Sequence, residues 1–186
     1  MVREAEALKE QIAYMSQRFG LYEDLTVLEN IAFYADIYCV PPGERGAKID
    51  RLLGFSGLTP FKKRLAGNLS GGMKQKLGLA CALIKAPTLL LLDEPSVGVD
   101  PISRRELWKM VHALVDEGIT VVWSTSYLDE AERCDTVLLL NEGKLLYYGP
   151  PKAMAQRVAG RTFMITDIVG NRRQLLAEAL LQENVL

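Results

Sequence analysis

The sequence is poor in the residues that build disulfide frameworks and zinc sites. It has one histidine and three cysteines, Cys39, Cys81 and Cys134, which form no CxxC pair. An odd number of widely spaced cysteines indicates neither a disulfide scaffold nor a metal site. We therefore interpret the three cysteines as buried, reduced thiols.

The chain also lacks a charge excess and any long apolar run. Over 186 residues, 22 lysines and arginines face 23 aspartates and glutamates, a net charge of −1. Nucleic-acid-binding domains are usually strongly basic, so a nucleic-acid partner is not expected.

The longest apolar runs fall far short of the roughly 18 residues typical of a membrane span, and the start does not resemble a secretory signal. Such a chain is expected in the cytoplasm, and a hydrophobic content of 49% is typical of a folded domain.

Apolar periodicity predicts an alternation of helices and strands. The first elements expected are a strand over 12–17, a helix over 27–38 capped by Thr26 and Glu29, and a weaker helix over 47–53. A helix over 73–84 capped by Ser70, a strand over 88–92, a helix opened by Ser103 and Glu106 that ends near Gly118, and a strand over 119–123 follow. The last are a hairpin over 137–148 and, after Pro150, a loose strand and a helix over 172–181.

Two buried strands joined by a helix require a right-handed crossover in a mostly parallel sheet, so the fold class is α/β. Ligands of such sheets bind at the carboxyl ends of the strands. The pair Asp93-Glu94 ends one strand, and residues 124–126 end the next. We therefore expect these side chains to meet at one edge of the sheet.

Two groups of residues could carry chemistry. Asp93 could hold Mg²⁺ through water and Glu94 could polarise an attacking water, although helix capping or a surface role is the alternative. Ser70, Gly71 and Gly72 begin a helix, where free N–H groups and the positive dipole end suit a phosphate. The alternative there is a flexible loop before a capped helix.

Taken together, these groups resemble the ATP-binding cassette (ABC) family, the ATPase domains of ABC transporters. Gln17 matches the Q-loop, residues 69–75 the signature, residues 89–94 the Walker B strand and residues 96–101 the D-loop, in the family's order. Residues 25–30 and 128–132 are most similar to cassettes of ABC-2-type exporters of drugs or lipids. The resemblance implies a partial P-loop NTPase core with a mostly parallel sheet and an α-helical subdomain.

The resemblance also implies roles for single residues. ATP would lie between two cassettes paired head to tail, as a homodimer or in tandem, and an ABC-2-type transmembrane permease would be driven at the cytoplasmic face of the membrane. The implied nucleotide and Mg²⁺ contacts come from Gln17, Asp93, Ser70, Gly71, Gly72 and Gln75, with Glu94 as general base and Asp100 as the bridge between the two sites.

The sequence departs from the family at two places. The P-loop GxxxxGK[ST] is absent, and Gln17 stands almost at the start, so we expect an N-terminal truncation that leaves the Walker B strand with an unpaired edge. Ser126 stands at the switch-histidine position, where the residue is catalytic in the family. Because a serine is shorter and uncharged, we expect it to position the attacking water less well.

These expectations divide the chain into a partial ABC ATPase domain over 1–150 and a C-terminal extension over 151–186. Within the first, the helical subdomain covers about 22–86 and the second half of the core about 87–150. The expected function is an ATPase subunit that couples ATP binding and hydrolysis to export. A module that donates its signature to a partner without hydrolysis is the alternative. A DNA-repair ATPase is disfavoured because coiled-coil heptads are missing.

A chain without a P-loop should be a poor nucleotide binder, because the β- and γ-phosphates lose the lysine and the nest of N–H groups that hold them. We expect residues 1–186 alone to bind MgATP weakly and to hydrolyse it negligibly. Isothermal titration calorimetry checks the first point, and phosphate release checks the second. A micromolar affinity for MgATP would contradict the prediction.

Overall fold

The computed structural model describes residues 8–18, 20–156 and 171–179. The chain forms two compact units, one from Met1 to Leu128 and the other from Asp129 to Leu186. The elements of the first unit are β1 (Ile12–Met15), α2 (Val27–Ile37), α3 (Pro42–Phe55), two 3₁₀ turns (Thr59–Phe61 and Ala66–Asn68), α4 (Gly71–Leu83), β2 (Leu89–Asp93), α5 (Pro101–Asp116) and β3 (Thr120–Ser124). After α6 (Leu128–Ala131), the second unit has β4 (Val137–Asn141), β5 (Lys144–Gly149), α7 (Pro151–Gln156) and α8 (Arg172–Ala179).

A three-stranded parallel sheet in the order β1-β2-β3 organises the first unit. Met15 pairs with Leu92 on one side of β2, and Asp93 pairs with Ser124 on the other. The α/β class with a parallel sheet is thus confirmed. The expectation that the strand before Asp93 has an unpaired edge is wrong, because β1 and β3 both bond to β2 and the outer strands of this sheet are β1 and β3.

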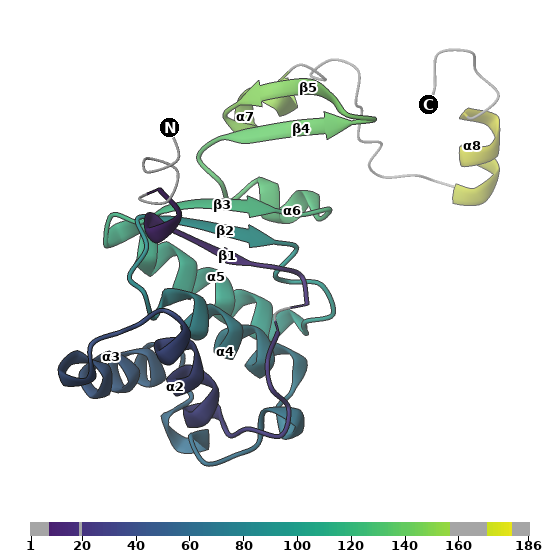
Figure 1. Cartoon of the computed structure of the whole chain (residues 1–186). Coiled ribbons are helices and arrows are strands. Elements are labelled where there is room, and N and C mark those ends of the chain that lie inside the picture. Colours follow the sequence, from purple (N-terminus) through teal and green to yellow (C-terminus); the bar gives the residue numbers. More distant parts are fainter. Residues whose placement is uncertain (1–7, 19, 157–170, 180–186) are drawn as a thin grey trace. The chain divides into compact units, whose positions relative to one another are not determined.

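Helices α4 and α5 lie on one face of this sheet (Figure 1). The side chains of Leu90 and Leu92 point toward that face and are at most 2% exposed. On the opposite face, Tyr14 of β1 and Val122 of β3 are 54% and 50% exposed. Parallel sheets are usually covered on both faces, and here the core forms under only one of them within the described residues.

Helix α2 begins where the sequence predicts it. Thr26 and Glu29 form the predicted capping box at the start of α2: Glu29 N donates to Thr26 Oγ1 over 3.2 Å, and Thr26 N donates to Glu29 Oε2 over 2.8 Å. Asn30, fully buried in α2, accepts a hydrogen bond from Tyr22 N over 2.9 Å and so fixes the chain that precedes the helix.

Several predicted boundaries are corrected. Helix α3 is longer than the expected 47–53 because Pro42, which ends the preceding segment, also suits the first turn of a helix. Helix α5 is capped by Asp100 rather than Ser103. Residues 151–156 form helix α7 instead of a loose strand. The interpretation of all three cysteines as buried is confirmed for Cys81 and wrong for Cys39, which is exposed, while Cys134 is half-buried.

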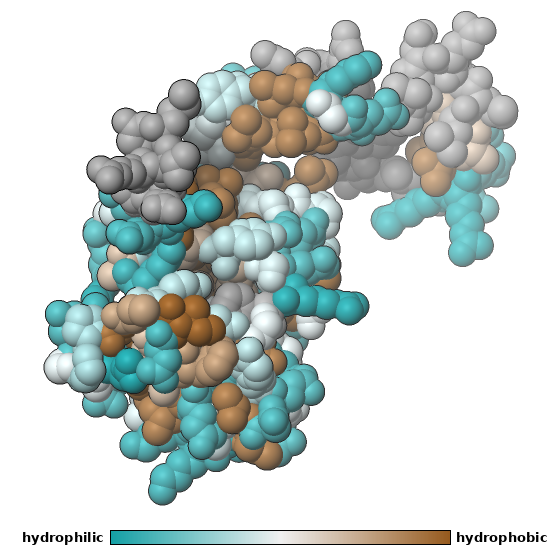
Figure 2. Space-filling model, in the orientation of Figure 1, coloured by the Kyte–Doolittle hydropathy of each residue, from teal (hydrophilic) through white to brown (hydrophobic). Residues whose placement is uncertain are grey.

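In the second unit, β4 and β5 form the predicted antiparallel hairpin. Its surface is rich in leucine, which appears as brown atoms over these two strands in Figure 2. The exposed apolar side chains are Leu138, Leu140, Leu145, Leu146 and Tyr148, each more than half exposed. Helix α8 confirms the last predicted helix up to Ala179; residues 180 and 181 lie outside the described part of the chain.

Among the helices in the described ranges, none combines the length and the apolar character that crossing a bilayer requires.

Candidate functional site

Asp93, the last residue of β2, is held from both neighbouring strands. Ser124 Oγ of β3 donates a hydrogen bond to Asp93 Oδ1 over 2.8 Å, and Tyr14 Oη of β1 donates to Asp93 Oδ2 over 3.1 Å. The hydrogen bond to this carboxylate also raises the pKa of Tyr14 above its ordinary value. No sequence motif marks Tyr14 as a site residue, although the alternation of side chains along β1 puts it on the same face as Asp93.

Glu94 has an unusual backbone conformation just after β2, with a φ of 47°. Non-glycine residues seldom adopt this left-handed region. Glu94 N donates to both the carbonyl and the hydroxyl oxygen of Ser124, each over 3.1 Å. Ser126 Oγ donates to Glu94 Oε2 over 3.3 Å. The structure therefore brings Ser126 next to Glu94, as the sequence predicted, and ties both to the end of β3.

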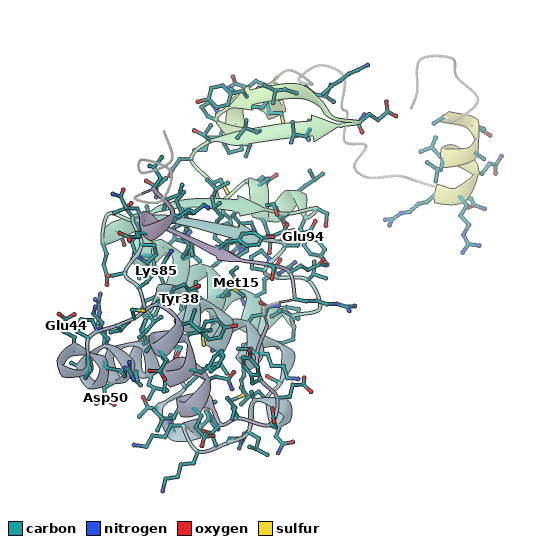
Figure 3. All side chains as sticks on the ribbon, viewed as in Figure 1. Met15, Tyr38, Glu44, Asp50, Lys85 and Glu94 are labelled. Carbon is teal, nitrogen blue, oxygen red and sulfur yellow. The ribbon has the colours of Figure 1, made fainter. Side chains whose placement is uncertain are left out.

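Gln17 follows β1 at the same edge of the sheet. Strand β1 ends at Met15, two residues earlier than predicted, and Met15 is the register partner of Leu92. Gln17 is exposed just beyond that point. Figure 3 shows Glu94 at the carboxyl end of the strands, and Met15 on the strand that leads to Gln17.

The residues of the predicted phosphate-binding helix form a second group. Ser70 caps α4, and its Oγ accepts a hydrogen bond from Met73 N over 3.3 Å. Gly72 is buried, and a β-carbon added there would overlap the side chain of Ser103 in α5. At Gly71, an added β-carbon would lie 3.2 Å from Gly98 O. Gly72 is thus needed for close packing of this helix end onto Ser103, and a side chain at Gly71 would have to displace Gly98 by a few tenths of an ångström.

Asp100 belongs to the same group and has a local task. Its Oδ1 accepts hydrogen bonds from Ile102 N and Ser103 N, each over 3.0 Å, which caps α5. Hydrogen bonding with the Ser103 side chain contributes most to holding the pKa of the Asp100 carboxyl below its usual range, and the backbone N–H groups of Ser103 and Ile102 add to it. On the facing helix, Gln75 Oε1 is buried without a hydrogen-bond partner in the described ranges.

An ion pair links the chain beyond Gln17 to α4. Lys74 Nζ lies 2.7 Å from Glu23 Oε1. The hydrogen bond from Lys74 holds the pKa of the Glu23 carboxyl below its usual range. Because the Glu23 side chain is 69% exposed, this pair adds little to stability. It does connect the loop that follows Gln17 to the helix that begins with the predicted signature.

The oxygen donors at the end of β2 suit Mg²⁺. This ion prefers one or two carboxylates, water and substrate phosphates to an all-protein cage. Within the described ranges, no cluster of three or more histidine, cysteine, aspartate or glutamate side chains could hold a metal by itself. The Asp93 carboxylate, which keeps lone-pair positions beyond its two hydrogen bonds, therefore fits an ion that takes most of its ligands from water and phosphate.

Comparisons with known proteins agree with this geometry. Residues 2–97 match the family described as ABC transporter. A probable multidrug ABC transporter ATP-binding protein, YbhF of Escherichia coli, is 61% identical over 94% of the chain, which spans 30% of that protein's length. The linearmycin resistance ATP-binding protein LnrL of Bacillus subtilis is 32% identical over 90% of the chain and 54% of its own length. The solved structure of CbiO1 from Clostridium perfringens, part of the ABC transporter complex CbiONQ, superposes with a TM-score of 0.76 at 27% identity, over 87% of this chain and 65% of that one.

The packing at Gly72 makes a prediction about stability. Gly72→Ala should lower the free energy of unfolding by about 1–3 kcal/mol, because the new methyl group meets Ser103 in a filled space. Urea denaturation of the chain measures this change. Gly46→Ala is the matched control: Gly46 lies inside α3 with nothing within 4 Å of an added β-carbon, so alanine there should stabilise by roughly 0.5–1 kcal/mol.

Adding Ser103→Gly to Gly72→Ala removes the side chain that the methyl group meets, and should recover part of the lost stability. Equal stability of Gly72→Ala and the unsubstituted chain would show that this glycine is not required for packing.

Proposed function

The chain belongs to the ABC transporter family, and we propose that it supplies part of an ATP-binding cassette that couples ATP binding and hydrolysis to export. The observation that carries the proposal is the hydrogen-bonded group at the end of β2, where Ser126 contacts the Glu94 carboxylate and Ser124 contacts Asp93. A carboxylate that orients a metal ion and a second one that accepts a proton are what phosphoryl transfer to water needs.

In the proposed reaction, Glu94 acts as general base. A water oxygen attacks the γ-phosphorus of ATP, the bond to the ADP oxygen breaks, and Glu94 accepts the proton that the water loses. When bound, Mg²⁺ neutralises charge on the phosphates, and Asp93 and Gln17 are the residues of this chain that would hold it. Ser126 would position the water through its contact with Glu94.

The second group would act across an interface. Ser70, Gly71, Gly72 and Gln75 stand at or near the N-terminus of α4, where the free N–H groups and the helix dipole favour a phosphate. We propose that they contact ATP held by a second cassette, and that Asp100 lies where the two sites meet.

In this proposal a partial ABC ATPase domain covers residues 1–150, with its helical subdomain at about 22–86 and the second half of its core at about 87–150, and residues 151–186 extend it.

The proposed setting is the cytoplasmic face of a membrane, reached through an ABC-2-type permease. The names of the relatives support export, since one is a probable multidrug transporter subunit and another confers linearmycin resistance. The alternative is a module that donates its α4 face to a P-loop-bearing partner and does not hydrolyse ATP. The observation that favours this alternative is the N-terminus of α4, which Ser70 caps and which Gly71 and Gly72 allow to pack closely onto residues 98–103.

A completed cassette, in which this chain is joined behind the P-loop-bearing half of a related cassette, tests the proposal. Glu94→Gln should lower its ATPase rate by about 100-fold to 10,000-fold, because the general base is lost while the shape of the side chain is kept. ATP binding should persist in a filter assay. Glu142→Gln, in the turn of the hairpin, is the control and should leave the rate unchanged.

The alternative is tested with the unjoined chain mixed with a complete ABC cassette. If the chain stimulates hydrolysis by that cassette, and if Ser70→Ala abolishes the stimulation while Glu94→Gln does not, the chain is a donor module. A completed cassette that hydrolyses ATP equally well with and without Glu94→Gln would exclude Glu94 as the base.

The serine at the switch position makes a further prediction. Ser126→His in the completed cassette should raise turnover, because an imidazole reaches farther than a hydroxyl and can donate to the γ-phosphate. Ser126→Ala serves as the control for simple loss of the hydroxyl. Unchanged or lower turnover with histidine would count against this role for residue 126.

A further inference from the structure

The carboxylate of Asp93 accepts one hydrogen bond on each oxygen, and the two donors come from different strands. We propose that Tyr14 and Ser124 are positioning residues that fix the direction in which Asp93 presents its carboxylate to Mg²⁺. This inference rests on the proposed function, because it assigns Asp93 the task of orienting the metal. Neither residue belongs to the motifs that point to the family.

The sheet register produces this arrangement. Asp93 lies directly opposite Ser124, so their side chains emerge on the same face from neighbouring strands. Tyr14 lies opposite Leu91, two residues before Asp93 and therefore on that same face. A tyrosine is long enough to cover this diagonal step, which a shorter hydroxyl side chain would not cover.

The two hydrogen bonds leave room for a ligand. A carboxylate has about four lone-pair positions, and Tyr14 and Ser124 occupy one on each oxygen. Each oxygen of Asp93 thus keeps a position for a metal-bound water. Because both oxygens are held, the carboxylate cannot rotate freely about its last bond, and its open positions keep one direction.

Ser124 also connects Asp93 to Glu94. Its hydroxyl donates to Asp93 Oδ1 over 2.8 Å and is an acceptor for Glu94 N over 3.1 Å. The same amide bonds to the carbonyl oxygen of Ser124, and Glu94 has a φ of 47°. The Ser124 side chain thus orients the Asp93 carboxylate and also holds the backbone of Glu94, the proposed base. Glu94 has a backbone conformation that a non-glycine residue seldom adopts without such support.

A purely structural role explains Tyr14 less well. Its side chain is 54% exposed on the uncovered face, so its ring contributes little to the core. A hydrogen bond between exposed groups adds little to folding because water competes for both partners. The same bond can still narrow the orientations of a carboxylate, which matters for a metal that requires near-ideal octahedral geometry.

The test uses the completed cassette with Tyr14→Phe, Ser124→Ala and Ser124→Thr. Metal affinity is read without turnover in a Glu94→Gln background, by electron paramagnetic resonance of free Mn²⁺ in the presence of ATP. Steady-state kinetics then give the half-saturating Mg²⁺ concentration and, separately, the KM for ATP. Tyr148→Phe is the control, because this tyrosine of β5 is 68% exposed and is none of the residues assigned to the site.

We expect Tyr14→Phe and Ser124→Ala each to weaken Mn²⁺ binding and to raise the half-saturating Mg²⁺ concentration about threefold to tenfold, as expected for the loss of one solvent-exposed hydrogen bond. The KM for ATP at saturating Mg²⁺ should stay within about twofold. Ser124→Thr should restore the metal affinity because it keeps the hydroxyl. Tyr148→Phe should change neither quantity.

Unchanged Mn²⁺ binding in Tyr14→Phe and Ser124→Ala would overturn the inference, and so would a loss of stability or turnover without a change in metal dependence. A different result would contradict the proposed function: an ATPase rate of the completed cassette that stays the same when Glu94→Gln is introduced. That result would remove the positioning role together with the function, whereas the first results would leave the function standing.

Discussion

The parallel pairing of β2 with a strand on each side is the constraint on which the rest of the site depends. It places the ends of three strands at one edge, so that Tyr14 and Ser124 contact Asp93 although they are far apart from it in the sequence. Hydrogen bonds from Tyr14 and Ser124 then fix the acidic pair within that edge. A slip of one residue would turn Asp93 to the face of α4 and α5, where an unpaired charge is costly.

The residues at the N-terminus of α4 are needed for packing, and in the proposed function they also contact ATP. Gly72 lets α4 approach Ser103 of α5, and Asp100 caps that same helix through two backbone N–H groups. These contacts are needed inside the chain whether or not a nucleotide is present. They also hold the N-terminus of α4 with its free N–H groups in a fixed place, which is what an anion-binding helix end requires.

Local patterns predicted most elements because the signals lay within a few residues. The Thr26–Glu29 capping box, the Ser70 cap of α4 and the apolar run of β2 appear as predicted. The errors arose where two local signals competed. Pro42 can end one segment or begin a helix, and Asp100 and Ser103 can each cap α5; only the geometry of the turn selects between them.

The sequence by itself determined the α/β class, the order of the motifs and the family, because these depend on periodicity and on residue types at fixed spacing. The tertiary structure decided which groups touch. It put β2 in the centre of the sheet, Tyr14 and Ser124 on the Asp93 carboxylate and Ser126 on Glu94. Those contacts depend on the register between strands that are separated by more than 25 residues of intervening helix and loop. No local pattern encodes that register, because it is set by how the leucines of β2 pack against the helices beneath them.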